Sequence, residues 1–402
     1  MSLVNIISAV GNNSSIYPLI VRDCGVEVPV KIGMTYSQNL KDSKEMANHA
    51  FRERTLDEYG TSIVWLGGIP LINKICNWGI KKLGLNPDVN PSLFKESKTQ
   101  GAKFNIEKFK NLAPKEVEEL EKVLKNKKKY ESLQIGKFAL STLIPIIIMG
   151  VIIPKLNFAL TANIKNKKEK QKQSLSQQKS INENISFKGF GASLINMKNV
   201  NKMAITDGGL TIGRVGTARN KYEKMEMGFK MSAMMFLNYL APIWIAKFFD
   251  KTSNKILNTN VDLDPKILND KDFIKSIVEN KFSAPTENLI DFLDKNPDSK
   301  FAQFAEKYCG VKYLKNRIRD PRIYINEKKL MDFANELNNF KSAAQKSKNP
   351  VKFAKKALRV KSANILANIA LSSFLLAFGL PKLTFVLRKL VTGSEAEPGL
   401  LE

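Results

Sequence analysis

The apolar sequence FALSTLIPIIIMGVIIPKLNFAL, residues 138–160, is the strongest single indication of the fold. Residues 138–154 carry no charge, and a helix that spans a bilayer needs about 20 mostly apolar residues, with a range of roughly 17–25. The last eight residues, IPKLNFAL at 153–160, match LPKLTFVL at 380–387 in five of eight positions. The stretch therefore predicts a helix that enters a membrane or forms the central core of a bundle, and it has a counterpart near the other end of the chain.

Three further apolar segments, 60–73, 231–249 and 364–387, interrupt a polar and basic background. Together with 138–160 they each carry a proline near one end of their uncharged part. A proline removes a backbone donor and breaks the regular helix, so these four positions are predicted helix bends: Pro70, Pro154, Pro242 and Pro381. Basic residues flank both ends of the segments, so the flanking charge does not orient them and favours shallow or re-entrant insertion.

The order of these landmarks is the same in both halves of the chain, which predicts a tandem duplication. Pro70 pairs with Pro242 and Pro154 with Pro381, and DCGV at 23–26 is similar to DGGL at 207–210. Residues 165–184, KNKKEKQKQSLSQQKSINEN, have the composition of a solvated linker between the copies. We therefore expect a mainly α-helical protein with two tandem copies of one helical unit, 1–164 and 185–402. Each copy has two apolar proline-containing helices and a basic helical insert, which in copy 2 covers 262–361.

The basic residues that precede the second apolar segment of each copy suggest contact with a membrane surface. Cationic side chains next to a bilayer are attracted to anionic lipid headgroups. Such side chains occupy the same place before 138–160 and before 364–387, and we predict headgroup or anion contacts for Lys125, Lys127, Lys128, Lys129, Lys352, Lys355, Lys356 and Arg359.

The overall charge invites a different interpretation, which is a soluble helical protein that binds nucleic acid. The 402 residues contain 64 Lys and Arg against 38 Asp and Glu, a net charge of +26. The cationic residues are mainly Lys. Proteins that bind nucleic acid usually use Arg for bidentate contacts, and their basic residues are clustered on one surface. Nucleic acid is therefore the less favoured partner, and this alternative requires the apolar segments to be buried internally in a cytoplasmic protein.

Candidate catalytic chemistry is sparse. Cys24, Cys76 and Cys309 are widely spaced and odd in number, and one histidine, His49, leaves little for a metal centre. One Gly-rich stretch could wrap backbone amides around a phosphate, although it lacks the GxxxxGK[ST] order. It would use Asp207, Gly208, Gly209, Gly213, Arg214, Gly216 and Arg219.

These observations predict a membrane-associated protein with a structural or interaction role, no catalytic activity, no cofactor and no metal. The expected location is a membrane, which in a bacterium would be the cytoplasmic (inner) membrane. The expected partners are anionic lipid and a protein partner or a second copy of the chain. Small-solute transport and binding of a phosphorylated ligand at 207–219 are minority alternatives.

Overall fold

The computed structural model describes residues 2–12, 15–41, 43–95, 97, 99–157, 159–160, 199–218 and 220–393. These residues are mainly helical and contain no strand; a single antiparallel bridge joins Tyr313 to Arg319. The predicted linker 165–184 and the predicted phosphate contact Arg219 lie outside the described residues. The chain forms two compact units, and each of them draws on both halves of the sequence.

Unit 1 comprises Met1–Asn12, Cys76–Gly136 and Trp244–Asn368. It holds the polar inserts, and most of the helices that lie entirely within it are short. It also contains the first part of α8 (Lys127–Ile147) and most of α13 (Ala241–Ile256) and α19 (Pro350–Phe374). The remaining helices are the end of α5 (Ile69–Lys82), with α1 (Leu3–Gly11), η3 (Pro91–Phe94), α6 (Ala102–Phe109), α7 (Pro114–Lys125), α14 (Pro265–Leu268), α15 (Lys271–Val278), α16 (Leu289–Lys295), α17 (Lys300–Tyr308) and α18 (Glu327–Lys346).

The core of unit 1 is aromatic. Phe273 of α15 makes edge-to-face contacts with Phe282 and Phe304, with ring centroids 4.8 and 5.3 Å apart, and stacks on Phe340 of α18 at 6.2 Å. Aromatic pairs in these geometries stabilise a core beyond the area that they bury. The insert is therefore a well-packed helical body and not a loose basic arm.

Local sequence signals account for the bounds of two helices in this region, α17 and α19. The spacing of Phe301, Phe304 and Tyr308 corresponds to α17, and Gly310 follows it with a φ of +79°, a conformation that favours glycine. Asn349 opens α19, since its Oδ1 accepts a hydrogen bond of 3.0 Å from the Lys352 amide.

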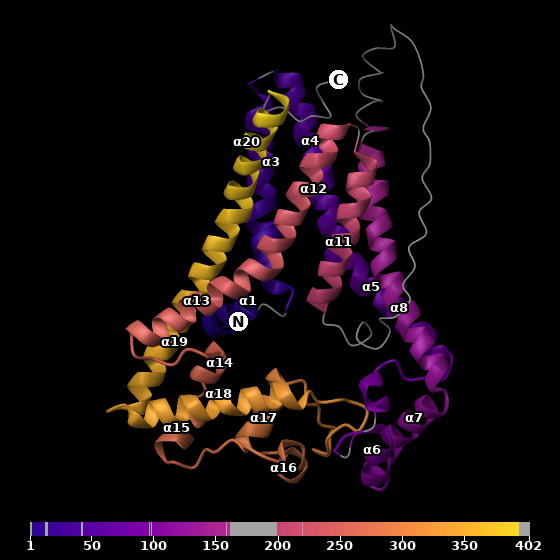
Figure 1. Cartoon of the computed structure of the whole chain (residues 1–402). Coiled ribbons are helices and arrows are strands. Elements are labelled where there is room, and N and C mark those ends of the chain that lie inside the picture. The colour runs from indigo at the N-terminus through magenta and orange to yellow at the C-terminus, as the bar shows by residue number, and fades with distance from the viewer. Residues whose placement is uncertain are drawn as a thin grey trace. The chain divides into compact units, whose positions relative to one another are not determined.

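Unit 2 comprises Asn13–Ile75, Lys137–Ile243 and Ile369–Glu402. Its long helices run side by side (Figure 1). Within it α3 packs on α4, α11 on α12 and on η4, α12 on α20, and α3 on η6. The elements are α2 (Tyr17–Arg22), η1 (Asp23–Glu27), α3 (Val28–Asn39), α4 (Lys44–Ile63), η2 (Val64–Gly68), the start of α5, the second part of α8, η4 (Ile148–Ile152), α11 (Asn199–Thr217), α12 (Lys221–Met235), η5 (Phe236–Leu240), the start of α13, the end of α19, η6 (Leu375–Gly379) and α20 (Leu380–Thr392).

A widened turn precedes each of five prolines in unit 2. The turns η1, η2, η4, η5 and η6 are five-residue π-helical segments, and each ends two residues before a proline. The prolines are Pro29 and the four predicted from the sequence, Pro70, Pro154, Pro242 and Pro381. At four of the turns the residue just before the proline donates its amide hydrogen bond five residues back, as Ile153 does to the Ile148 carbonyl.

The wide turn relieves two consequences of proline in a helix. The ring clashes with the carbonyl four residues earlier, and that carbonyl loses its donor. A π turn moves the carbonyl aside, and side chains supply new donors. The Asn238 carbonyl, four residues before Pro242, accepts from Arg22 Nη2 at 3.3 Å. The Gly150 carbonyl, four residues before Pro154, accepts from the Thr217 hydroxyl at 3.5 Å. The helices therefore continue past their prolines.

Apart from a core of apolar residues that includes Leu19, Met149 and Leu210, unit 2 has an inside-out distribution of polarity. Large apolar side chains point outward, among them Leu390 at 76% exposed and Ile63 at 71%. Charged side chains are buried, among them Lys31 at 1% exposed and Arg22 at 3%. In water this arrangement exposes apolar area and desolvates charge, and both effects oppose folding. It is the arrangement expected where lipid is the outer solvent.

Among the residues that the structure describes, three helical stretches are long and apolar enough to cross a membrane: Lys127–Asn157, Lys221–Ile256 and Pro350–Thr392. Each contains most or all of one predicted apolar segment, and at most 39% of its apolar window is buried. The remaining predicted segment, 60–73, is helical but is not among the three. The prediction of membrane-compatible helices is confirmed at this level for 138–160, 231–249 and 364–387.

Candidate functional site: a charged pocket in unit 2

Two helices, α4 and α12, bring charged side chains together inside unit 2. On α4, Arg54 lies one turn before Glu58, and Asp57 lies one turn after Glu53. On α12, Glu223, Glu226 and Lys230 follow one another at intervals of three and four residues, which places them on one face. On each helix these charged residues therefore lie close together on the helix surface.

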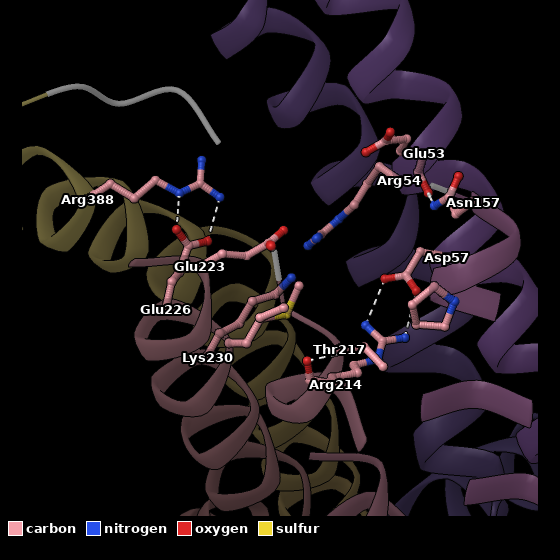
Figure 2. A pocket seen from close by; sticks show the side chains of 13 residues that line it. Glu53, Arg54, Asp57, Asn157, Arg214, Thr217, Glu223, Glu226, Lys230 and Arg388 are labelled. Carbon is pink, nitrogen blue, oxygen red and sulfur yellow. Dashed lines mark hydrogen bonds and ion pairs between the residues drawn. The ribbon is translucent and has the colours of Figure 1, made fainter. Parts of the chain in front are cut away.

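Two bidentate ion pairs form the walls of this pocket (Figure 2). Arg214 of α11 donates to both carboxylate oxygens of Asp57 at 2.7 Å, and its Nη2 also donates to the Thr61 hydroxyl at 2.9 Å. Arg388 of α20 donates to both oxygens of Glu226, at 2.5 and 2.6 Å. Paired hydrogen bonds of this kind fix the guanidinium and the carboxylate in one geometry, so the walls are rigid.

Lys230 is the exception among these cations. In the part of the chain that the structure describes, no carboxylate lies within ion-pair distance of its ammonium group and no hydrogen bond to it is formed. Figure 2 shows Lys230 and Arg54 pointing toward the centre of the pocket from different helices. Arg54 Nη2 lies 3.0 Å from the Glu58 carboxylate. Lys230 is therefore the cation available to a ligand.

The pocket has a volume of about 70 Å³ and lies among α4, α11, α12 and α20. Asn157 closes one side, and its amide donates to the Glu53 carbonyl at 2.8 Å. Such a volume accommodates a few water molecules or one small polar group. The charged residues that line it are Glu53, Arg54, Asp57, Arg214, Glu223, Glu226, Lys230 and Arg388.

The Gly-rich stretch is helical and not the phosphate-binding loop that its sequence suggested. Residues 207–217 belong to α11, so their amides are engaged in the helix. Gly213 lies against Gly150 of η4, where an added Cβ would come within 3.2 Å of the Gly150 Cα. Asp207 accepts a hydrogen bond of 2.5 Å from the Tyr239 hydroxyl. Glycine here serves close helix packing, and of the predicted phosphate contacts that the structure describes only Arg214 lines the charged pocket.

The predicted lipid-contacting residues lie in unit 1, and all of them are exposed. One group covers the end of α7 and the start of α8, and the other covers the first turns of α19. Lys127 sits over the Phe94 ring, and Lys356 Nζ donates to the Leu257 carbonyl at 2.6 Å. None of them lines the charged pocket, so they form separate features of the molecule.

The remaining candidates for catalysis or metal binding stay weak. Burial raises the pKa of the Cys309 thiol to about 11, which keeps it protonated and unreactive near neutral pH. Among the residues that the structure describes, no group of three His, Cys, Asp or Glu side chains could hold a metal ion.

Sequence reasoning missed most of the charged pocket. The spacing of Glu223, Glu226 and Lys230 was a usable signal, because charges at intervals of three and four residues directly before an apolar segment imply a polar helix face inside a bundle. The partners on α4 and α20 had no such local signal, since they meet α12 only in the folded unit.

Comparisons of the chain with protein-family models, with curated proteins and with solved structures found no match.

Proposed function

We propose that the chain is an integral membrane protein whose helical bundle encloses a binding pocket for a small charged group. The inside-out polarity of unit 2 is the observation that carries this proposal. Apolar side chains cover the exterior of long helices, and ion-paired charges line the interior. Ionisable residues within membrane helices are costly and are usually retained for binding or transport. We propose a binding role and no catalysis.

The charged pocket favours small-solute transport more than the sequence alone did. Transport was disfavoured because the four apolar segments contain no acidic residue. In the folded unit, α4 and α12 supply carboxylates next to those segments. A structural or interaction role remains the second candidate, and it is favoured by the exposed basic residues at the starts of α8 and α19.

The packing of unit 2 supports the proposed duplication. If α3, α4 and α8 correspond to α11, α12 and α19–α20, the first helix of each copy packs on the third helix of the other. The contacts of α11 with η4 and of α3 with η6 have this reciprocal form. The π turns before Pro70 and Pro242, and those before Pro154 and Pro381, fall at corresponding places. The proposed architecture is thus two interlocked copies.

Membrane residence predicts that the full chain, expressed in a bacterium, stays in the membrane pellet after extraction with alkaline carbonate and enters solution only with detergent. Peripheral proteins held by charge are released under these conditions, whereas helices with apolar exteriors are not. The measurement is an immunoblot of pellet and supernatant. Recovery of a detergent-free soluble monomer would exclude the proposal.

The predicted headgroup contacts have their own test. Changing Lys125, Lys127, Lys128 and Lys129 to Gln should reduce the preference of the protein for vesicles rich in phosphatidylglycerol over phosphatidylcholine vesicles, by at most roughly 1 kcal/mol per charge. The matched control changes four exposed lysines of the insert to Gln, namely Lys271, Lys307, Lys312 and Lys315. Equal losses in both variants at low salt would show that net charge, and not the position before α8, sets the preference.

A further inference from the structure

A second, smaller cavity of unit 2 is lined by four cations. Lys31 of α3, Arg54 of α4, Lys230 of α12 and Arg388 of α20 surround about 20 Å³, which is room for one water-sized group. The described residues that line it include no carboxylate. The others are apolar or hydroxylic: Met34, Thr35, Leu380, Pro381, Thr384 and Phe385.

Three of the four cations have an ion-pair partner, whereas Glu58 and Asp57 act on Lys230 electrostatically without forming an ion pair with it. Lys31 pairs with Glu27, Arg54 with Glu58 and Arg388 with Glu226. Lys230 adds a fourth positive charge for which the described residues offer no ion pair. Like charges that converge in a poorly solvated interior repel one another, and an unpaired buried charge is costly. A bound anion would offset both effects.

This cationic cavity adjoins an apolar groove between α12 and α20. The groove has a volume of about 250 Å³ and is lined mainly by Tyr222, Met225 and Phe229 of α12 and by Leu387 and Val391 of α20. Its lining also includes Glu226, whose carboxylate is paired with Arg388. Thr384 and Arg388 line both the cavity and the groove. An anion at Lys230 would therefore lie beside a place for a hydrocarbon chain.

The three cavities together define an amphiphilic site. Arg54, Lys230 and Arg388 are shared by the cationic cavity and the larger charged pocket, which can receive the polar remainder of a headgroup. We infer that unit 2 binds an anionic phospholipid, with a phosphate oxygen at Lys230 and one acyl chain in the groove between α12 and α20. Phosphate suits the site because its several oxygens can accept from lysine and arginine donors at once. This inference rests on the proposed membrane insertion.

The test uses the purified full chain in an uncharged detergent with three probes: phosphatidic acid, inorganic phosphate and dioleoylglycerol. The thermal unfolding midpoint and native mass spectra report binding. We expect phosphatidic acid to raise the midpoint and to remain bound in the mass spectrum, because it alone supplies both the anion and the chains. Equal stabilisation by inorganic phosphate would show a free-anion site and overturn the lipid assignment, and equal stabilisation by dioleoylglycerol would overturn the role of the cations.

Two variants locate the site. Lys230→Gln should weaken phosphatidic acid binding about tenfold or more, the effect of losing one charged hydrogen bond, and should raise the midpoint without lipid because repulsion is relieved. Leu387→Trp should fill the groove and weaken binding of phosphatidic acid. The controls are Lys224→Gln, an exposed lysine of α12, and Val386→Trp, which lies outside the groove.

Lipid binding and carbonate extraction together distinguish failure of the lipid site from failure of the proposed membrane insertion. Unchanged phosphatidic acid binding in Lys230→Gln, with folding intact, would overturn the lipid site even if the protein resists carbonate extraction. If the protein is released by carbonate, membrane insertion fails whatever the binding data show. A lower midpoint of lipid-free Lys230→Gln would also count against the site, because it would mean that Lys230 has a structural partner.

Discussion

Replacing Arg214 by Met is expected to destabilise unit 2 by about 3–5 kcal/mol, the cost of removing one partner from a buried ion pair. Arg214 is 7% exposed, and it satisfies both carboxylate oxygens of Asp57 as well as the Thr61 hydroxyl. Without it the Asp57 carboxylate, whose side chain is only 16% exposed, loses its ion-pair partner. Denaturant unfolding in detergent micelles, followed by circular dichroism, measures the loss.

A double variant tests the cause of this loss. Arg214→Met combined with Asp57→Leu removes both charges and should recover most of the stability, since buried pairs can often be replaced by apolar residues at little net cost. Arg214→Lys keeps the positive charge but loses the paired hydrogen bonds that the guanidinium donates to Asp57. The stability of this variant should therefore lie between those of the wild type and the Met variant. If the double variant is as unstable as the single one, the guanidinium acts through packing and not through Asp57.

The helical character and the apolar segments could be predicted because they depend on local pattern. Residues 138–154 form an uncharged run, and the spacing of Phe301, Phe304 and Tyr308 is helical; both properties are visible without any tertiary contact. The prolines were also visible as perturbations of helices. The π turn before each one was not predicted, because a widened turn is one of several ways in which a helix can accommodate a proline ring.

The charged pocket was beyond local reasoning because its residues come from helices far apart in the sequence. Asp57 and Arg214 are 157 positions apart, and Glu226 and Arg388 are 162 apart. In a chain with 102 charged residues, many such pairs are available, and the packing of the helices selects among them. The pattern nevertheless contained one clue that points to packing: Gly209 and Gly213 are four residues apart, a spacing that brings membrane helices close together.

Gly213→Leu should destabilise unit 2 by about 1–3 kcal/mol or more, because α11 and η4 approach through the backbone at this position. An added Cβ would lie 3.2 Å from the Gly150 Cα and 3.4 Å from its carbonyl atoms. Backbone cannot move aside as a side chain can, so the two helices must separate. Separation would also pull the Thr217 hydroxyl away from the Gly150 carbonyl that Pro154 leaves without an amide donor.

The control for this prediction is Gly216→Leu on the same helix. An added Cβ at Gly216 meets no atom within 4 Å, and leucine favours a helix over glycine by up to about 1 kcal/mol. Gly216→Leu should therefore leave the stability unchanged or raise it, while Gly213→Leu lowers it, both measured by denaturant unfolding in the same detergent. Equal effects of the two substitutions would mean that glycine at 213 reflects helix propensity alone. In that case the close approach of α11 to η4 would not hold unit 2 together, and the reciprocal packing that supports the proposed duplication would lose its structural basis.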